Sequence, residues 1–226
     1  MTTTQLPLLL ASASPRRRQI LANLGLPYEV TVAPGDEDAA QAQYRGPAAG
    51  MAQWTASYKA LMMFSRAELP QNLVITADTT VILDDQVLGK PRDEEHAREL
   101  LRSLRGRWHR VVTGVAVTAC QNGEVHMQGA SCSTPVLMRP YSDEEIDAYI
   151  ATGDPMDKAG AYGIQHTNFR PTEKIDGCYF NVVGLPLCTL VQLLARFNVQ
   201  PANAGLANAG LANSACPWSE QCHINK

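Results

Sequence analysis

The hydrophobic and polar positions near the start of the chain predict a buried strand followed directly by a helix. Residues 6–11 form a short apolar run without alternation, which is typical of a strand covered on both faces. Ser14 is a good N-cap, and Pro15 suits the first helical position, where its missing N–H costs nothing. A buried stripe is expected at Ile20, Leu21 and Leu24, and Gly25 can end the helix. The pattern therefore places a helix N-terminus at the end of a buried strand.

The remaining pattern predicts further strands and helices up to about residue 199. Strands are expected over 28–32, 73–83, 108–119, 124–138 and 178–183, and helices over 47–68, 93–104 and 187–197. Asn122-Gly123 is a strong hairpin signal, and Ser142 with Glu145 forms a capping box that opens another helix. In the helix over 47–68, the stripe expected to face the core is Met51, Trp54, Tyr58, Leu61 and Met62.

The C-terminal segment differs in composition from everything before it. A block of Ala-Asn-Ala-Gly-Leu at residues 202–206 is repeated at 207–211. Two short repeats are too few for a solenoid. We therefore expect one domain over residues 5–200 and a low-complexity tail over 201–226.

Composition and charge exclude several classes of protein. The chain has 226 residues, 45% of them hydrophobic, so it can bury a full core. A net charge of −3 gives no global basic footprint for nucleic acid. No run approaches the ~18–20 apolar residues that cross a bilayer, and the N-terminus lacks the pattern of a secretory signal. We expect a cytoplasmic protein that binds neither nucleic acid nor membranes.

The turn after the first predicted strand carries candidate chemistry. It holds Ser12 and Ser14, followed by Arg16, Arg17 and Arg18. Hydroxyl groups, guanidinium groups and the positive end of a helix dipole together suit an anion such as a phosphate chain. The alternative is a capped surface helix with its arginines in solvent.

Acidic and basic residues at four other places add to this picture. Asp78 interrupts a β-branched strand, where a carboxylate is costly unless it is paired, protonated or bound to a metal. Glu37 lies in an acidic segment that is either a solvated loop or a source of a hard-cation ligand. Lys59 would ordinarily extend to solvent, and Lys90 follows a flexible Gly89. The side-chain amide of Gln165 could read the edge of a base, or it could be a solvated loop residue.

Taken together, these stretches resemble the Maf family of nucleoside triphosphate pyrophosphatases. The matching motifs, in order, are Ser-Ala-Ser-Pro-Arg-Arg at 12–17, Asp-Glu at 36–37, Lys-Ala at 59–60, Ala-Asp-Thr at 77–79, Gly-Lys-Pro at 89–91, Asp-Lys-Ala-Gly-Ala-Tyr-Gly-Ile-Gln at 157–165 and Asn-Val-Val-Gly-Leu-Pro at 181–186. Each motif alone is weak, but their shared order over residues 8–199 is specific.

The resemblance implies a fold and a reaction. The fold would be an α/β structure related to the inosine triphosphatases, with a long mixed sheet and two lobes around a cleft. The reaction would cleave a nucleoside triphosphate into a monophosphate and pyrophosphate with a divalent cation, Mg²⁺ or Mn²⁺. The residues Arg16, Thr79 and Gln165 are similar to those of the subgroup that hydrolyses dTTP and UTP. A homodimer is common in families of this kind and is left open.

The resemblance also implies roles for individual residues. The triphosphate would be held by Ser12, Ser14, Arg16 and Arg17, and the pyrimidine base would be selected by Gln165 with Thr79 and Arg16. The catalytic residues would be Asp78, Lys59, Lys90 and Glu37, with Glu37 and Asp78 holding the metal ion. Two rival functions remain: a non-catalytic nucleotide-binding regulator of cell division, and a phosphatase that releases orthophosphate.

Overall fold

The computed structural model describes residues 6–65 and 70–201, so nearly all of the predicted tail lies outside the described residues. The strands are β1 (Leu8–Ala11), β2 (Tyr28–Thr31), β3 (Leu73–Leu83), β4 (Gln86–Leu88), β5 (Trp108–Gln121), β6 (Glu124–Met138) and β7 (Thr172–Ile175). The α-helices are α1 (Pro15–Ala22), α2 (Glu37–Gln43), α3 (Met51–Phe64), α4 (Glu94–Leu104), α5 (Asp143–Ile150), α6 (Tyr179–Val183) and α7 (Leu187–Ala195). Short 3₁₀ turns are η1 (Ala48–Gly50), η2 (Asp154–Asp157) and η3 (Ala159–Ala161).

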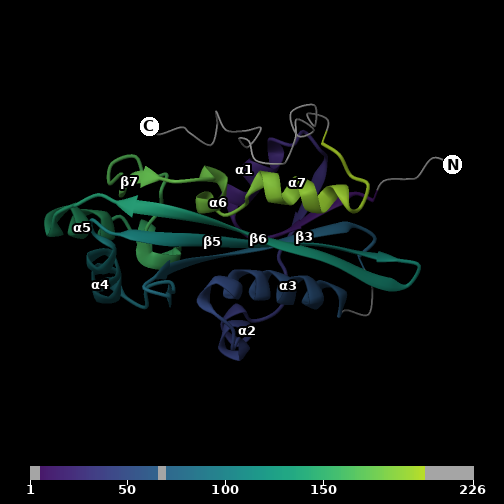
Figure 1. The fold of residues 1–226 in the computed structure, drawn as a ribbon, viewed down its shortest axis with the longest axis horizontal. Coiled ribbons are helices and arrows are strands. Elements are labelled where there is room, and N and C mark those ends of the chain that lie inside the picture. Colours follow the sequence, from purple (N-terminus) through teal and green to yellow (C-terminus); the bar gives the residue numbers. More distant parts are fainter. Residues whose placement is uncertain (1–5, 66–69, 202–226) are drawn as a thin grey trace.

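The strands form one seven-stranded mixed sheet with the order β2-β1-β3-β5-β6-β7, and β4 pairs with β3. β1 runs parallel to β2 and β3, and the other pairs are antiparallel. Helices α1, α6 and α7 cover one face of the sheet, and α2 and α3 cover the other (Figure 1). This arrangement confirms the expected α/β class with a mixed sheet flanked by helices. No helix in the described ranges is long and apolar enough to cross a membrane.

The edge of β3 that faces β1 is only partly paired. The pairing with β1 ends at Leu10 and Ile75, and the pairing with β4 begins at Val81. In the described part of the chain, residues 76–80 therefore have a strand neighbour only on the β5 side. Ligands of open α/β sheets bind where neighbouring strands separate in this way.

Several local predictions are confirmed. Ser14 caps α1 by accepting from the backbone N–H of Arg17, with Pro15 at the first position. The capping box of Ser142 and Glu145 is present at α5. β5 and β6 form the long hairpin that Asn122-Gly123 predicts, and both of these residues have positive φ.

The buried face of α3 is not the one that the sequence predicted. Trp54 is 43% and Leu61 is 52% exposed, so neither belongs to the core stripe expected for them. The buried residues are instead mostly small, together with Lys59: Ala52, Thr55, Ala56, Lys59, Ala60, Met63 and Phe64. A Cβ on Gly114 of β5 would lie 2.4 Å from Cα of Gln53, so α3 approaches the sheet too closely for bulky side chains.

Two other segments also differ from prediction. Residues 178–183 were expected to form a strand, but 179–183 form α6, because the Cys178 sulfur accepts from Asn181 N and caps a helix. The sheet edge beside β6 is taken by β7, which the sequence pattern did not reveal. The acidic segment continues into helix α2, because Asp36 accepts from the backbone N–H groups of Asp38 and Ala39.

Candidate active site

The turn between β1 and α1 presents two serine hydroxyl groups. Ser12 Oγ accepts from Ser14 N at 3.3 Å and from Arg17 Nη1 at 3.4 Å. Ser14 Oγ accepts from Arg17 N at 3.4 Å. In these three bonds the serine oxygen is the acceptor, and among the described residues no acceptor takes either hydroxyl proton, so both can bind a ligand. The turn can therefore donate hydrogen bonds to an anion.

Arg17 uses most of its guanidinium N–H groups in hydrogen bonds within the protein. Its Nε donates to Gly184 O at 2.8 Å, and its Nη1 donates to Ala77 O at 2.8 Å and to Ser12 Oγ. Its Nη2 donates to Thr79 Oγ1 at 3.1 Å. Arginine has five N–H groups, so these contacts leave one for a substrate. Arg17 thus joins the β1–α1 turn, β3 and the end of α6.

Lys59 lies between two carboxylates on the opposite face of the sheet. Its Nζ is 2.9 Å from Asp78 Oδ1 and 2.8 Å from Glu37 Oε1. The side chains of Lys59 and Asp78 are 9% and 8% exposed, whereas that of Glu37 is 45% exposed. Lys59 therefore does not extend to solvent as lysines on helices usually do, because α3 presses its stem against β3 and its charge is paired.

The two carboxylates have opposite pKa shifts. Burial raises the pKa of Asp78, and the charges of Lys59 and Arg17 only partly counter this effect. Burial alone would also raise the pKa of Glu37, but the charge and hydrogen bond of Lys59, with the charges of Lys90 and Arg17, lower it. Two carboxyl groups with pKa values pushed apart are a common basis for acid–base chemistry.

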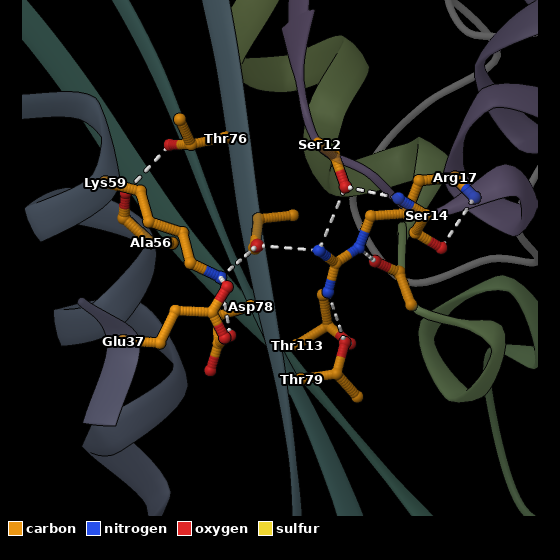
Figure 2. Close-up of polar contacts among 12 residues, drawn as sticks. Ser12, Ser14, Arg17, Glu37, Ala56, Lys59, Thr76, Asp78, Thr79 and Thr113 are labelled. Atoms are coloured by element: carbon orange, nitrogen blue, oxygen red, sulfur yellow. Dashed lines mark hydrogen bonds and ion pairs between the residues drawn. The ribbon is translucent and has the colours of Figure 1, made fainter. Parts of the chain in front are cut away.

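The two halves of the site meet at β3. Figure 2 shows Glu37, Lys59 and Asp78 on one side of the strand, and Ser12, Ser14, Arg17 and Thr79 on the other. The carbonyl of Ala77 accepts from Arg17 Nη1 at 2.8 Å and from Lys59 Nζ at 3.4 Å. This carbonyl lies in the stretch of β3 between its pairings with β1 and β4. The structure thus brings together the arginine-rich turn and the acidic interruption of β3 that the sequence singled out.

The three remaining predicted site residues are Lys90, Arg16 and Gln165, and their links to the rest of the site are less direct. Lys90 is exposed, and its charge adds to that of Lys59 in lowering the pKa of Glu37. Arg16 is partly buried beside Arg17, whose pKa its charge lowers. Gln165 is exposed in the turn after η3, and the segment before it is tied to the Lys90 region by a bond from Gly160 N to Gly89 O.

The carboxylates are suited to a divalent cation shared with a substrate. Among the described residues, no group of three or more His, Cys, Asp and Glu side chains could hold a metal ion alone. Asp78 Oδ2 is buried and has no hydrogen-bond partner in the described structure. Mg²⁺ typically binds one or two protein carboxylates and completes its shell with water and substrate phosphates. Asp78 Oδ2 and the exposed carboxylate of Glu37 fit that pattern.

Some groups at this site were not found from the sequence. The backbone carbonyls of Ala77 and Gly184 accept the two shortest bonds of Arg17, and backbone acceptors have no residue signature. Thr113 is a fully buried residue of β5, and its Oγ1 lies 2.9 Å from Oγ1 of Thr79. The nearest sequence signal was the motif at 181–186, since Asn181 holds Thr113.

Comparisons with known proteins show what this chain is similar to. A family model described as Maf-like protein matches residues 7–197. A dTTP/UTP pyrophosphatase of Thermomicrobium roseum is 46% identical over 189 residues, which cover 84% of this chain and 83% of the relative. One of Dictyoglomus thermophilum is 44% identical over 193 residues, 84% of this chain and 96% of the relative. One of Dehalococcoides mccartyi is 42% identical over 204 residues, 88% of this chain and 86% of the relative.

Proposed function

Because the chain belongs to the family of Maf-like proteins, we propose that it hydrolyses a nucleoside triphosphate to the monophosphate and pyrophosphate. The observation that carries this proposal is the cluster of Lys59, Asp78 and Glu37 beside the serine- and arginine-rich turn. A buried acid with an unpartnered oxygen, next to donors suited to phosphates, matches hydrolysis of a phosphoanhydride bond.

The triphosphate would be bound by the β1–α1 turn. Ser12 and Ser14 donate their free hydroxyl protons, and the N-terminus of α1 adds its dipole. Arg16 supplies a second cation beside Arg17, whose remaining N–H can reach a phosphate oxygen. Lys59 and Lys90 offset the negative charge that builds up on the leaving pyrophosphate.

Asp78 would act as the general base. Lys59 holds its Oδ1, so the two lone pairs of Oδ2 are left, one to bind a cation and one to take a proton from water. The water oxygen forms a bond to the α-phosphorus, the bond from that phosphorus to the bridging oxygen breaks, and the water proton passes to Asp78. Burial raises the pKa of Asp78, which makes it a stronger base than an ordinary aspartate.

A divalent cation, Mg²⁺ or Mn²⁺, fits this site through Asp78 and Glu37. When bound, it would neutralise phosphate charge and polarise the phosphorus centre. The position of Glu37 at the start of α2, its ion pair with Lys59 and its partial exposure support this role.

The names of the similar proteins support a preference for dTTP and UTP. Within this proposal, Arg16 and Gln165 contact the pyrimidine base, with Thr79 nearby, and the enzyme works in the cytoplasm as a monomer or homodimer. An amide can donate and accept at once, which suits the edge of thymine or uracil.

The reaction is tested with a panel of nucleoside triphosphates, with Mg²⁺ or Mn²⁺ present, and separate detection of pyrophosphate and orthophosphate. Pyrophosphate and monophosphate in equal amounts are expected, with dTTP and UTP as the best substrates. Orthophosphate as the first product would identify a phosphatase instead. Tight binding of a nucleotide without any release would identify a non-catalytic regulator.

A further inference from the structure

A chain of buried hydroxyl groups lies behind Arg17. Thr79 Oγ1 accepts from Arg17 Nη2 and is 2.9 Å from Thr113 Oγ1. Thr113 Oγ1 is in turn 2.8 Å from the backbone oxygen of Asn181 in α6. Thr113 and Asn181 are fully buried, and Figure 2 shows Thr113 next to Thr79 on the Arg17 side of β3.

Hydrogen-bond chemistry fixes the direction of this chain. A carbonyl oxygen can only accept, so Thr113 must spend its single hydroxyl proton on Asn181 O. Thr79 must then donate its own proton to Thr113. The chain therefore has one polarity, from Arg17 to Thr79, from Thr79 to Thr113, and from Thr113 to Asn181.

This polarity limits what Thr79 can do for a substrate. Its proton is directed at Thr113, and one lone pair faces Arg17, so it has no proton left for a nucleotide base. Thr79 is thus better suited to hold Arg17 than to donate to the substrate. The α6 region therefore holds Arg17 in two ways. Gly184 O, just after the helix, accepts from Arg17 directly, and Asn181 O holds it indirectly through Thr113 and Thr79.

The anchor at the end of the chain is rigid. Asn181 Oδ1 accepts from Thr113 N at 3.1 Å, and Asn181 Nδ2 donates to Val111 O at 2.8 Å and to Thr134 Oγ1 at 2.9 Å. Every polar atom of this buried amide therefore has a partner on β5 or β6. A fully satisfied buried network allows one arrangement and resists displacement.

We propose that the buried hydroxyl of Thr113 is a positioning group that holds Arg17, through Thr79, in the geometry that the β1–α1 turn needs for its substrate. The proposal rests on the proposed function for its effect on rate. Thr113 itself touches no substrate, since it lies in β5 behind Thr79. Loss of its hydroxyl releases Thr79 to rotate and leaves Arg17 Nη2 without a fixed acceptor.

Three variants test this role through the kinetics of pyrophosphate release. Thr113→Val keeps the shape but removes the hydroxyl, and kcat/KM is expected to fall about tenfold or more. Thr113→Ser keeps the hydroxyl and is expected to stay close to the wild-type value. Thr118→Val is the matched control, because Thr118 is also buried in β5 but its hydroxyl has no hydrogen-bond partner in the described structure. The proposal is overturned if Thr113→Val is as active as the wild type, or if Thr113→Ser is equally impaired.

A second measurement is independent of turnover. In ¹⁵N NMR spectra of the full chain, assigned with Arg17→Lys, the Nη protons of Arg17 are expected to exchange slowly with solvent. Exchange should become faster in Thr113→Val and return to the wild-type rate in Thr113→Ser. Unchanged exchange in Thr113→Val overturns the positioning role. If the wild type releases no pyrophosphate, the proposed function fails, and this readout still decides the role of Thr113.

Discussion

Arg17 and Lys59 donate hydrogen bonds to the same backbone carbonyl, that of Ala77, from helices on opposite faces of the sheet. Both side chains can reach this carbonyl because, in the described structure, the edge of β3 that faces β1 has no strand neighbour between Ile75 and Val81. The next residue is Asp78, whose carboxylate binds Lys59. Two cations and a buried acid are thus held around a single peptide unit.

Asp78→Asn is expected to lower kcat on the order of a hundredfold or more, because the amide cannot accept a proton from the attacking water. Pyrophosphate release from dTTP measures the effect. Asp84→Asn is the control, since Asp84 lies in an exposed turn and pairs with Arg107 at the surface. Near-normal turnover of Asp78→Asn would refute its role as general base.

Lys59→Met is expected to lower the free energy of unfolding by about 3 kcal/mol, because it leaves the buried Asp78 without its cation. Chemical denaturation at pH 8 measures this loss. Asp78 without Lys59 has a still higher folded pKa, so the loss should shrink as the pH falls toward the unfolded pKa of about 4.

Two companion variants make this test specific. Adding Asp78→Asn to Lys59→Met should restore most of the stability, since no buried charge then lacks a partner. Arg107→Met breaks an exposed ion pair with Asp84 and should cost no more than about 1 kcal/mol. An additive double variant would contradict the coupling of Lys59 to Asp78.

Glu37→Gln is expected to raise the Mg²⁺ concentration needed for half-maximal activity on the order of tenfold. Its carboxylate is the partly exposed member of the pair that fits a cation. Removing divalent cations with excess chelator should abolish pyrophosphate release in the wild type, and added Mg²⁺ should restore it. Asp38→Asn, in the same first turn of α2, is the matched control. An unchanged Mg²⁺ requirement in Glu37→Gln would exclude Glu37 as a ligand.

His109 makes the fold sensitive to mild acid. Its Nε2 lies 2.7 Å from Tyr162 Oη in a buried contact, and burial lowers its pKa to about 4. Between the folded pKa and the ordinary value of about 6.5, the unfolded chain binds a proton that the folded chain rejects, so stability falls as pH falls. His109 should contribute a loss of about 2 kcal/mol between pH 7 and pH 5.

Urea denaturation of the wild type and of His109→Gln at these two pH values measures that contribution. The variant should lose less stability than the wild type on acidification. His126→Gln should behave like the wild type, because His126 is about half exposed on the β5–β6 hairpin. Equal acid sensitivity of His109→Gln and the wild type would show that other groups carry the effect.

Local patterns predicted the elements whose residues act locally. The β-branched run of β3, the cap at Ser14 and the capping box at Ser142 each needed only a few neighbouring residues to be recognised. By contrast, the face of α3 depends on how closely it approaches Gly114, which lies far away along the chain. The spacing of apolar residues predicted that Trp54 and Leu61 face the core. The close contact between α3 and the sheet instead requires small residues such as alanine on the buried face.

The candidate site also divides into features that local patterns reveal and features that depend on contacts between distant parts of the chain. Asp78 and the turn at Ser12 stood out because a carboxylate in an apolar strand and a cluster of arginines are unusual in themselves. The pairing of Lys59 with both carboxylates could not be read from the pattern, since it requires α2, α3 and β3 to be placed together. Helix α6 was mistaken for a strand because its aromatic and β-branched residues favour strands, whereas the cap by Cys178 and the tertiary bonds of Asn181 hold it as a helix.

Because Arg17 and Lys59 share the carbonyl of Ala77, the rate of turnover should report whether the helices on both faces of the sheet are in place. The groups that converge there come from helices on opposite faces of the sheet (Figure 1). Loosening either layer moves one donor away while the other stays, so chemistry should disappear before the sheet itself melts. If this junction loosens first, heating should inactivate the protein at a temperature below its cooperative unfolding.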